Sequence, residues 1–179
     1  MANEAALLER ARAYDEEALG ELYDRYAPKM YSYIYRRVGD AATAEDLTGE
    51  LFLRVVRSLR NDRAWRESFS AWLYRIAHNL VVDHYRSLPE HPEQPVEAWM
   101  EGDGGDLAAA LEARAGRERL RAATRRLTPE QQEVLALRYG EGLTSAETGR
   151  ILKKSTGAVE ALQHRALASL RRILAGEEL

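Results

Sequence analysis

The sequence contains no cysteine, only three lysines and only five prolines among its 179 residues. Without thiols the chain can form neither a disulfide framework nor a cysteine-ligated zinc or iron–sulfur centre. No apolar run approaches the roughly 18 residues that cross a bilayer. The first twelve residues carry Glu4 and Glu9 in place of a basic segment followed by an apolar one, so we expect no signal peptide. The sequence therefore predicts a cytoplasmic protein.

Charges of both signs are abundant, and they are unevenly distributed along the chain. The formal net charge is -3, yet residues 1–53 sum to -5, residues 54–87 to +4, residues 88–116 to -6 and residues 117–174 to +6. Two basic blocks separated by an acidic block favour two modules that each contact a polyanion.

The acidic block also marks the boundary between the modules. Three of the five prolines lie in residues 89–95, and the run Glu101–Gly102–Asp103–Gly104–Gly105–Asp106 follows. Proline removes backbone donors, glycine raises the entropy lost on ordering, and like charges repel, so this segment cannot form a core. We predict domains over 1–87 and 107–179, joined by an acidic linker over 88–106.

No segment alternates apolar and polar residues with a period of two, so the fold class is predicted to be all-α, with two small helical domains. Helical spacing of apolar residues is clear, as in Leu47, Leu51, Val55 and Leu59. Pro28 is expected to kink or divide the second helix. The predicted helices cover 4–13, 15–37, 43–59, 69–86, 107–126, 129–139, 144–152 and 156–174. Thr128 with Gln131 is a predicted capping box before the helix 129–139.

The last two predicted helices form a helix-turn-helix pattern. Thr144 with Glu147 is a capping box before a short helix, and Ser155 caps the longer helix that follows. In this motif the start of the second helix enters the major groove, where its free N–H groups also attract phosphate. An ordinary helical hairpin with solvated polar residues is the alternative. The candidate DNA-binding residues are Thr144, Ser155, Thr156, Glu160, Ala161, Gln163, His164 and Arg165.

A second set of candidates lies around the predicted helix 69–86. Cations interleaved with aromatic residues and an amide suit single-stranded or melted DNA, because bases stack on rings while arginines hold the backbone. A role for Trp72 in the core is the alternative. The candidates in this set are Arg60, Arg63, Trp72, Arg75, Asn79 and Arg86.

The predicted helix 43–59 carries an acidic surface beside its apolar stripe. Asp46, Glu50 and Phe52 combine carboxylates with an aromatic ring, which suits docking onto a basic partner helix. A solvated acidic face is the alternative.

These segments resemble a known family. Residues 44–52 (AEDLTGELF), 72–79 (WLYRIAHN) and 83–86 (DHYR) look like region 2 of bacterial sigma factors. Residues 127–135 (LTPEQQEVL) through His164–Arg165–Ala166 look like region 4. The short chain, with only a linker between the two regions, resembles the extracytoplasmic-function (ECF) group of the sigma-70 family.

This resemblance implies a promoter-specificity subunit of RNA polymerase. Asp46, Glu50 and Phe52 would dock on the clamp helices of core polymerase. Residues 60–68, with Arg75, Asn79 and Arg86, would open and hold the −10 promoter element. The second domain would read the −35 element and contact the flap, while the acidic linker would thread toward the active-site cleft. An anti-sigma factor is a further expected partner, and no cofactor or metal is expected.

Five positions depart from the family pattern. Gly49 stands where glutamine is common, and Lys153 stands in the turn where glycine is usual, which predicts an altered turn. Glu160, Ala161 and Leu167 stand where basic or hydroxylic residues are common.

Two other functions compete with the sigma-factor interpretation. One is a helix-turn-helix transcriptional regulator that is not a polymerase subunit. The other is a metal-dependent enzyme that uses His78, Asp83, His84 and His91. Along one helix, however, His78 and His84 are separated by about 240°, so their imidazoles diverge.

Overall fold

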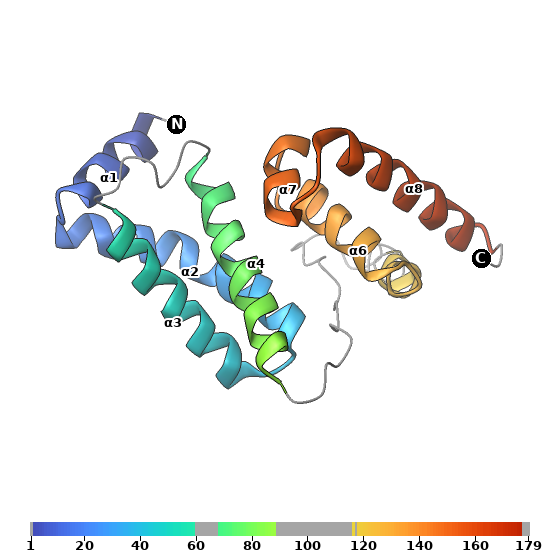
Figure 1. Ribbon diagram of the computed structural model, residues 1–179, viewed down its shortest axis with the longest axis horizontal. Helices are drawn as coiled ribbons and strands as arrows, with labels where there is room; N and C mark the ends of the chain where they lie inside the picture. Colours follow the sequence, from blue (N-terminus) through green and yellow to red (C-terminus); the bar gives the residue numbers. More distant parts are fainter. Residues whose placement is uncertain (1, 60–67, 89–115, 117, 177–179) are drawn as a thin grey trace, which may run out of the picture. The chain divides into compact units, whose positions relative to one another are not determined.

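Two helical units make up the computed structural model of the chain (Figure 1). The structure describes residues 2–59, 68–88, 116 and 118–176. Packing divides the chain into a first unit, Met1–Pro95, and a second unit, Val96–Leu179. Within the described residues every regular element is a helix, which confirms the predicted all-α class.

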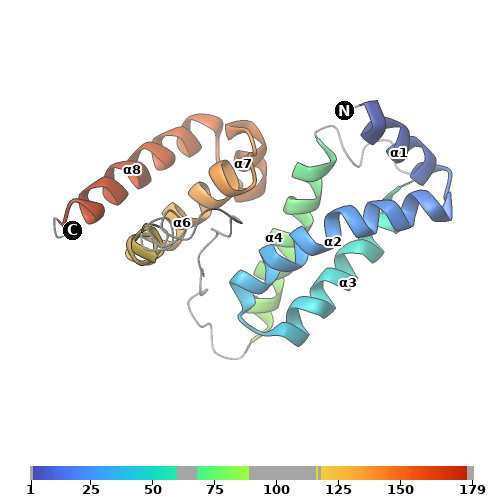
Figure 2. The same ribbon diagram turned by 180° about the vertical axis from the view of Figure 1, so that it is seen from behind.

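In the first unit, α2 contacts α1, α3 and α4, and α3 also contacts α4 (Figure 2). Three of these helices begin at a side chain that accepts a hydrogen bond from a backbone N–H three residues on, which satisfies a donor that the first turn leaves free. These N-caps are Asp15, Asp40 and Ser68. The helices are α1 (Ala2–Arg12), α2 (Glu16–Val38), α3 (Ala41–Ser58) and α4 (Phe69–Ser87).

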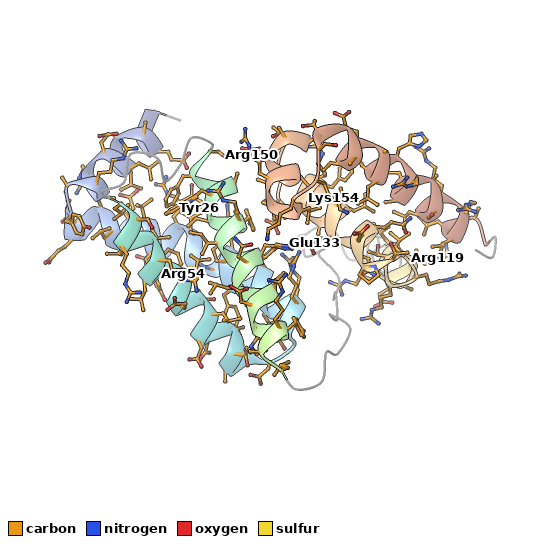
Figure 3. The ribbon with its side chains drawn as sticks, viewed as in Figure 1. Tyr26, Arg54, Arg119, Glu133, Arg150 and Lys154 are labelled. Carbon is orange, nitrogen blue, oxygen red and sulfur yellow. The ribbon has the colours of Figure 1, made fainter. Side chains whose placement is uncertain are left out.

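The core of the first unit is apolar and aromatic. Leu51, Val55 and Leu59 are at most 3% exposed, as their spacing predicts, whereas Leu47 is only half-buried. Each large side chain buried in this way stabilises the unit by about 1.5–3 kcal/mol. The hydroxyl of Tyr26 donates to the Glu4 carboxylate, which ties α1 to α2, and burial raises the pKa of Tyr26 (Figure 3).

Pro28 does not divide the second helix, so the expected division there is wrong. The helix α2 runs without interruption from Glu16 to Val38. Pro28 lies on its exposed side, while Met30, Tyr33 and Ile34 on the inner side are fully buried. Burial of that apolar face offsets the hydrogen bond that proline cannot donate.

The second unit contains α6 (Pro129–Leu135), a π-helical turn η1 (Ala136–Gly140), α7 (Ser145–Leu152) and α8 (Thr156–Leu174). Residues 118–125 are also helical, within the predicted span 107–126. Both predicted capping boxes are present, at Thr128–Gln131 and Thr144–Glu147, and Ser155 caps α8. The core brings together Ala123, Leu127, Val134, Leu135, Val159, Leu162, Ala166 and Ile173.

Most of the predicted linker over 88–106 lies outside the described residues, as do Arg60, Arg63 and His91. None of the helices in the described ranges is long and apolar enough to cross a membrane.

Candidate nucleic-acid interface

The turn between α7 and α8 is closely packed. Lys153 ends α7 in the left-handed conformation, with φ of 55°, at the position where the sequence predicted an altered turn. The next amide, from Lys154, donates to the Gly149 carbonyl over 2.8 Å. A Cβ added to Gly149 would lie only 2.6 Å from the Lys154 carbonyl oxygen. Glycine at position 149 therefore lets the turn fold back onto α7.

The first half of α8 presents a polar face. Val159, Leu162 and Ala166 are buried on the inner side, so the opposite side is left to solvent. The free N–H groups and positive dipole of the first turn favour phosphate there, although the Glu160 carboxylate opposes it. Exposed on this face are the predicted residues Thr156, Glu160, Ala161, His164 and Arg165, with the caps Thr144 and Ser155 also exposed.

Gln163 differs from these residues because its amide already has partners within the protein. Its Oε1 accepts a hydrogen bond from Arg138 Nε at 2.9 Å, and its Nε2 donates to the Tyr139 hydroxyl at 2.9 Å. Arg138 also donates to the Leu143 carbonyl. Gln163 thus links α8 to η1, and it is less available to DNA than the sequence suggested.

On α4, the predicted DNA-facing residues separate into two groups. Arg75 and Asn79 are half-buried, and Arg86 is exposed, with its Nη1 3.8 Å from Asp83 Oδ1. Trp72 is 5% exposed and packs on Phe69 with ring centroids 5.7 Å apart. Of the two interpretations of Trp72, this burial favours a role in the core, because the ring presents no open stacking surface.

Of the three residues predicted to form the acidic surface on α3, Asp46 is exposed, Glu50 is paired within the helix and Phe52 is buried. Asp46 is exposed, and Glu50 Oε1 accepts a hydrogen bond from Arg54 Nε at 2.9 Å (Figure 3). Phe52 is 9% exposed and packs against Tyr23, with ring centroids 4.8 Å apart. Tyr23 is 50% exposed, so it, rather than Phe52, offers the aromatic surface to a partner.

No metal centre accounts for the histidines in the part of the chain that the structure describes. There, no group of three or more His, Asp or Glu side chains is placed to hold a metal ion. The His84 ring instead packs against Tyr85, with centroids 5.5 Å apart.

Comparisons with known proteins match both units. The family model for Sigma-70 region 2 matches residues 22–88, and the model for Sigma-70, region 4, matches residues 124–172. The ECF RNA polymerase sigma factor SigK of Mycobacterium tuberculosis is 32% identical over 173 residues, covering 94% of this chain and 92% of the relative. The chain belongs to the ECF sigma factors. This ECF sigma factor is also 42% identical over 171 residues to BldN of Streptomyces coelicolor, covering 94% of this chain and 64% of BldN.

Two solved structures are also similar to this chain. The structure of CnrH in complex with the cytosolic domain of CnrY is 25% identical, covers 97% of each chain and gives a TM-score of 0.63. A chain of the RsbN–BldN complex is 40% identical, covers 93% of this chain and 98% of that chain, and gives a TM-score of 0.41.

Proposed function

We propose that this chain is a promoter-specificity subunit that binds core RNA polymerase and directs transcription initiation. The observation that carries the proposal is the match of region 2 and region 4, in that order, to two separate helical units. The second unit adds a capped helix-turn-helix with an exposed polar face on α8. The two units would thus bind two separate elements of one promoter, and core polymerase would catalyse RNA synthesis.

The exposed residues divide among three roles. Asp46 and Glu50 on α3 would contact the clamp helices of core polymerase. Phe52 would contribute by packing against the exposed ring of Tyr23. Arg75, Asn79 and Arg86 on α4, with Arg60 and Arg63, would hold the melted −10 element. The polar face of α8 would read the −35 element, at Thr144, Ser155, Thr156, Glu160, Ala161, His164 and Arg165. We keep the domain boundaries 1–87, 88–106 and 107–179 as part of this proposal.

In this account the chain is not an enzyme. Binding of the melted strand by the first unit would supply the free energy for opening, so the chain itself would hydrolyse no nucleotide. It would act in the cytoplasm, where core polymerase and chromosomal DNA are found.

An anti-sigma factor is a further partner that we propose. The related CnrH was solved in complex with the cytosolic domain of another protein, CnrY. A partner that occupies the polymerase-binding surface of this chain would keep it from core polymerase until a signal released it.

Run-off transcription with sigma-free core polymerase tests the proposal. We expect the purified chain to bind core polymerase and to start RNA synthesis from a cognate promoter. The competing function, a helix-turn-helix regulator, predicts DNA binding without stable association with core polymerase and without initiation. Failure of both association and initiation would therefore reject the sigma-factor role.

A further inference from the structure

A network of hydrogen bonds joins the π-helical turn η1 to α8 and ends at the protein surface. Arg138 Nε donates to Gln163 Oε1 at 2.9 Å, and Gln163 Nε2 donates to the Tyr139 hydroxyl at 2.9 Å. The Arg138 guanidinium also donates to the Leu143 carbonyl, which anchors it within the unit. Tyr139, at the other end, is 51% exposed. We call Arg138, Gln163 and Tyr139 the Gln163 network.

The direction of each hydrogen bond in the Gln163 network follows from its chemistry. The guanidinium of Arg138 can only donate, so the amide atom that faces it must be the oxygen of Gln163. The Gln163 nitrogen then faces Tyr139, and the phenolic oxygen must accept from it. In the described part of the chain, no group accepts a hydrogen bond from the Tyr139 hydroxyl. Its own O–H is therefore left to donate to a group outside the protein.

A hydroxyl held in this way suits an anionic acceptor. Hydrogen bonds from an O–H to a charged oxygen are short and about twice as strong as those between neutral groups. The positive charge of Arg138 polarises the Gln163 amide, which in turn makes the Tyr139 O–H a better donor. The phosphate oxygens of DNA accept hydrogen bonds from tyrosine whatever the base sequence.

The Gln163 network lies at the level where α8 would leave the major groove. Gln163 follows Thr156, the first residue of α8, by seven residues, so about 10 Å of helix separates them. The major groove is about 8.5 Å deep. With the start of α8 in the groove, residues at the level of Gln163 lie near its rim, which is formed by phosphates. Tyr139 reaches this level from η1, beside α8.

We propose that the Tyr139 hydroxyl donates a hydrogen bond to a DNA phosphate beside the −35 element, and that Arg138 and Gln163 position this hydroxyl. The inference rests on the proposed sigma-factor function and extends it, because Tyr139 is outside the set of residues that the sequence predicted to contact DNA. Gln163 acts through Tyr139 and does not contact DNA itself.

Removal of the hydroxyl alone tests the contact. Tyr139→Phe keeps the ring, so we expect the affinity of the reconstituted holoenzyme for its cognate promoter duplex to fall by about tenfold. Because the phenol is uncharged, the slope of log affinity against log salt should stay the same, whereas loss of a cation that contacts phosphate lowers it by about one. Tyr35→Phe is the matched control and should leave the affinity unchanged, since Tyr35 is 41% exposed but lies on α2 of the first unit.

Neutral phosphates in the DNA locate the contact. A methylphosphonate is placed at one position at a time through the −35 element and its flanks. One position should weaken binding of the wild type clearly but have little further effect on Tyr139→Phe, because the two changes remove the same hydrogen bond. Equal losses for the two proteins at every position, or full affinity of Tyr139→Phe, overturn the proposal.

Gln163→Glu tests whether the network positions the hydroxyl. A carboxylate still accepts from Arg138 but has no donor for Tyr139, so the hydroxyl would turn to donate to it and would no longer reach phosphate. The substitution should therefore weaken promoter binding more in the wild type than in the Tyr139→Phe background, where only the added charge acts. Circular dichroism melting confirms that the variants stay folded. Equal losses in the two backgrounds overturn the positioning role of Gln163.

Transcription by the wild-type holoenzyme separates this proposal from the proposed function. If the wild type initiates while Tyr139→Phe binds the promoter with full affinity, the phosphate contact is wrong and the sigma-factor role stands. If the wild-type chain forms no holoenzyme with core polymerase, both proposals fail.

Discussion

At the scale of single residues, Gly149 decides how closely the turn approaches α7. A methyl group at this position would meet the Lys154 carbonyl oxygen at 2.6 Å, and a backbone atom cannot move aside as a flexible side chain can. We expect Gly149→Ala to destabilise the second unit by roughly 1–3 kcal/mol, measured as lost amide hydrogen-exchange protection in α7 and α8. Gly157→Ala is the control, because nothing lies within 4 Å of its added Cβ. Equal protection in both variants would contradict the close approach.

Lys153 adopts a backbone conformation that L-residues disfavour. Its φ of 55° places the Cβ close to its own backbone, which costs about 1–2 kcal/mol in a non-glycine residue. Lys153→Gly removes that cost, so it should raise the free energy of unfolding of the second unit by up to about 1 kcal/mol after the entropy lost by glycine is counted. Lys153→Ala removes the charge but keeps the Cβ and should give no gain. A loss of stability in Lys153→Gly would show that the turn is not strained.

At the scale of helices, most N-termini could be predicted from the sequence. Ser, Thr or Asp followed by a helix-forming run is a local signal, because a side chain satisfies a backbone donor only two or three residues away. The capping boxes at Thr128 and Thr144 and the cap at Ser155 needed no knowledge of the fold. The uninterrupted α2 was not predictable in this way, because packing of its buried face outweighs the local effect of Pro28.

The N-caps Asp15 and Asp40 make the stability of the first unit depend on pH. The hydrogen bond from Arg10 and the amide of Ala18 lower the pKa of Asp15, and the Thr43 amide lowers the pKa of Asp40. A carboxyl with a lowered pKa in the folded state stabilises the protein above its unfolded pKa of 3.8, and this stability is lost as the pH falls further.

We therefore expect the double variant Asp15→Asn, Asp40→Asn to melt with a shallower pH dependence than the wild type between about pH 4 and about pH 2. Asparagine still accepts the capping hydrogen bonds but does not titrate, so the variant retains the helices. The melting temperature of α-helical circular dichroism across this range is the measurement. Parallel pH profiles for the two proteins would show that these caps do not cause the dependence.

The π-helical turn η1 is an element that the sequence did not predict. Its contact with α8 depends on Gln163, which is hydrogen-bonded to Arg138 and Tyr139. These partners lie 25 and 24 residues away in the sequence. No local pattern reports such a contact. We expect Gln163→Ala to destabilise the second unit by about 1 kcal/mol without any DNA present, whereas His164→Ala, at an exposed neighbouring position, should not. Unchanged denaturation of Gln163→Ala would return Gln163 to the set of free DNA-contacting residues.

At the scale of the whole molecule, the sequence predicted two helical units, their order and the helix-turn-helix. The spacing of apolar residues and the capping residues are local signals, and the charge blocks can be read directly from the sequence. The sequence could not show that Trp72 and Phe52 are mostly buried, because tryptophan and phenylalanine occur both in cores and at interfaces. It also could not show the groove lined by Tyr23, Tyr31 and Glu45, which forms only when α2 and α3 pack together.

The most direct test of the central claim is initiation from genomic DNA by sigma-free core polymerase supplied with the purified chain, followed by sequencing of RNA 5′ ends. The account predicts a small set of discrete start sites that share two upstream sequence elements, one for each helical unit. Random starts at the level of core polymerase alone, or no RNA from any template, would contradict it.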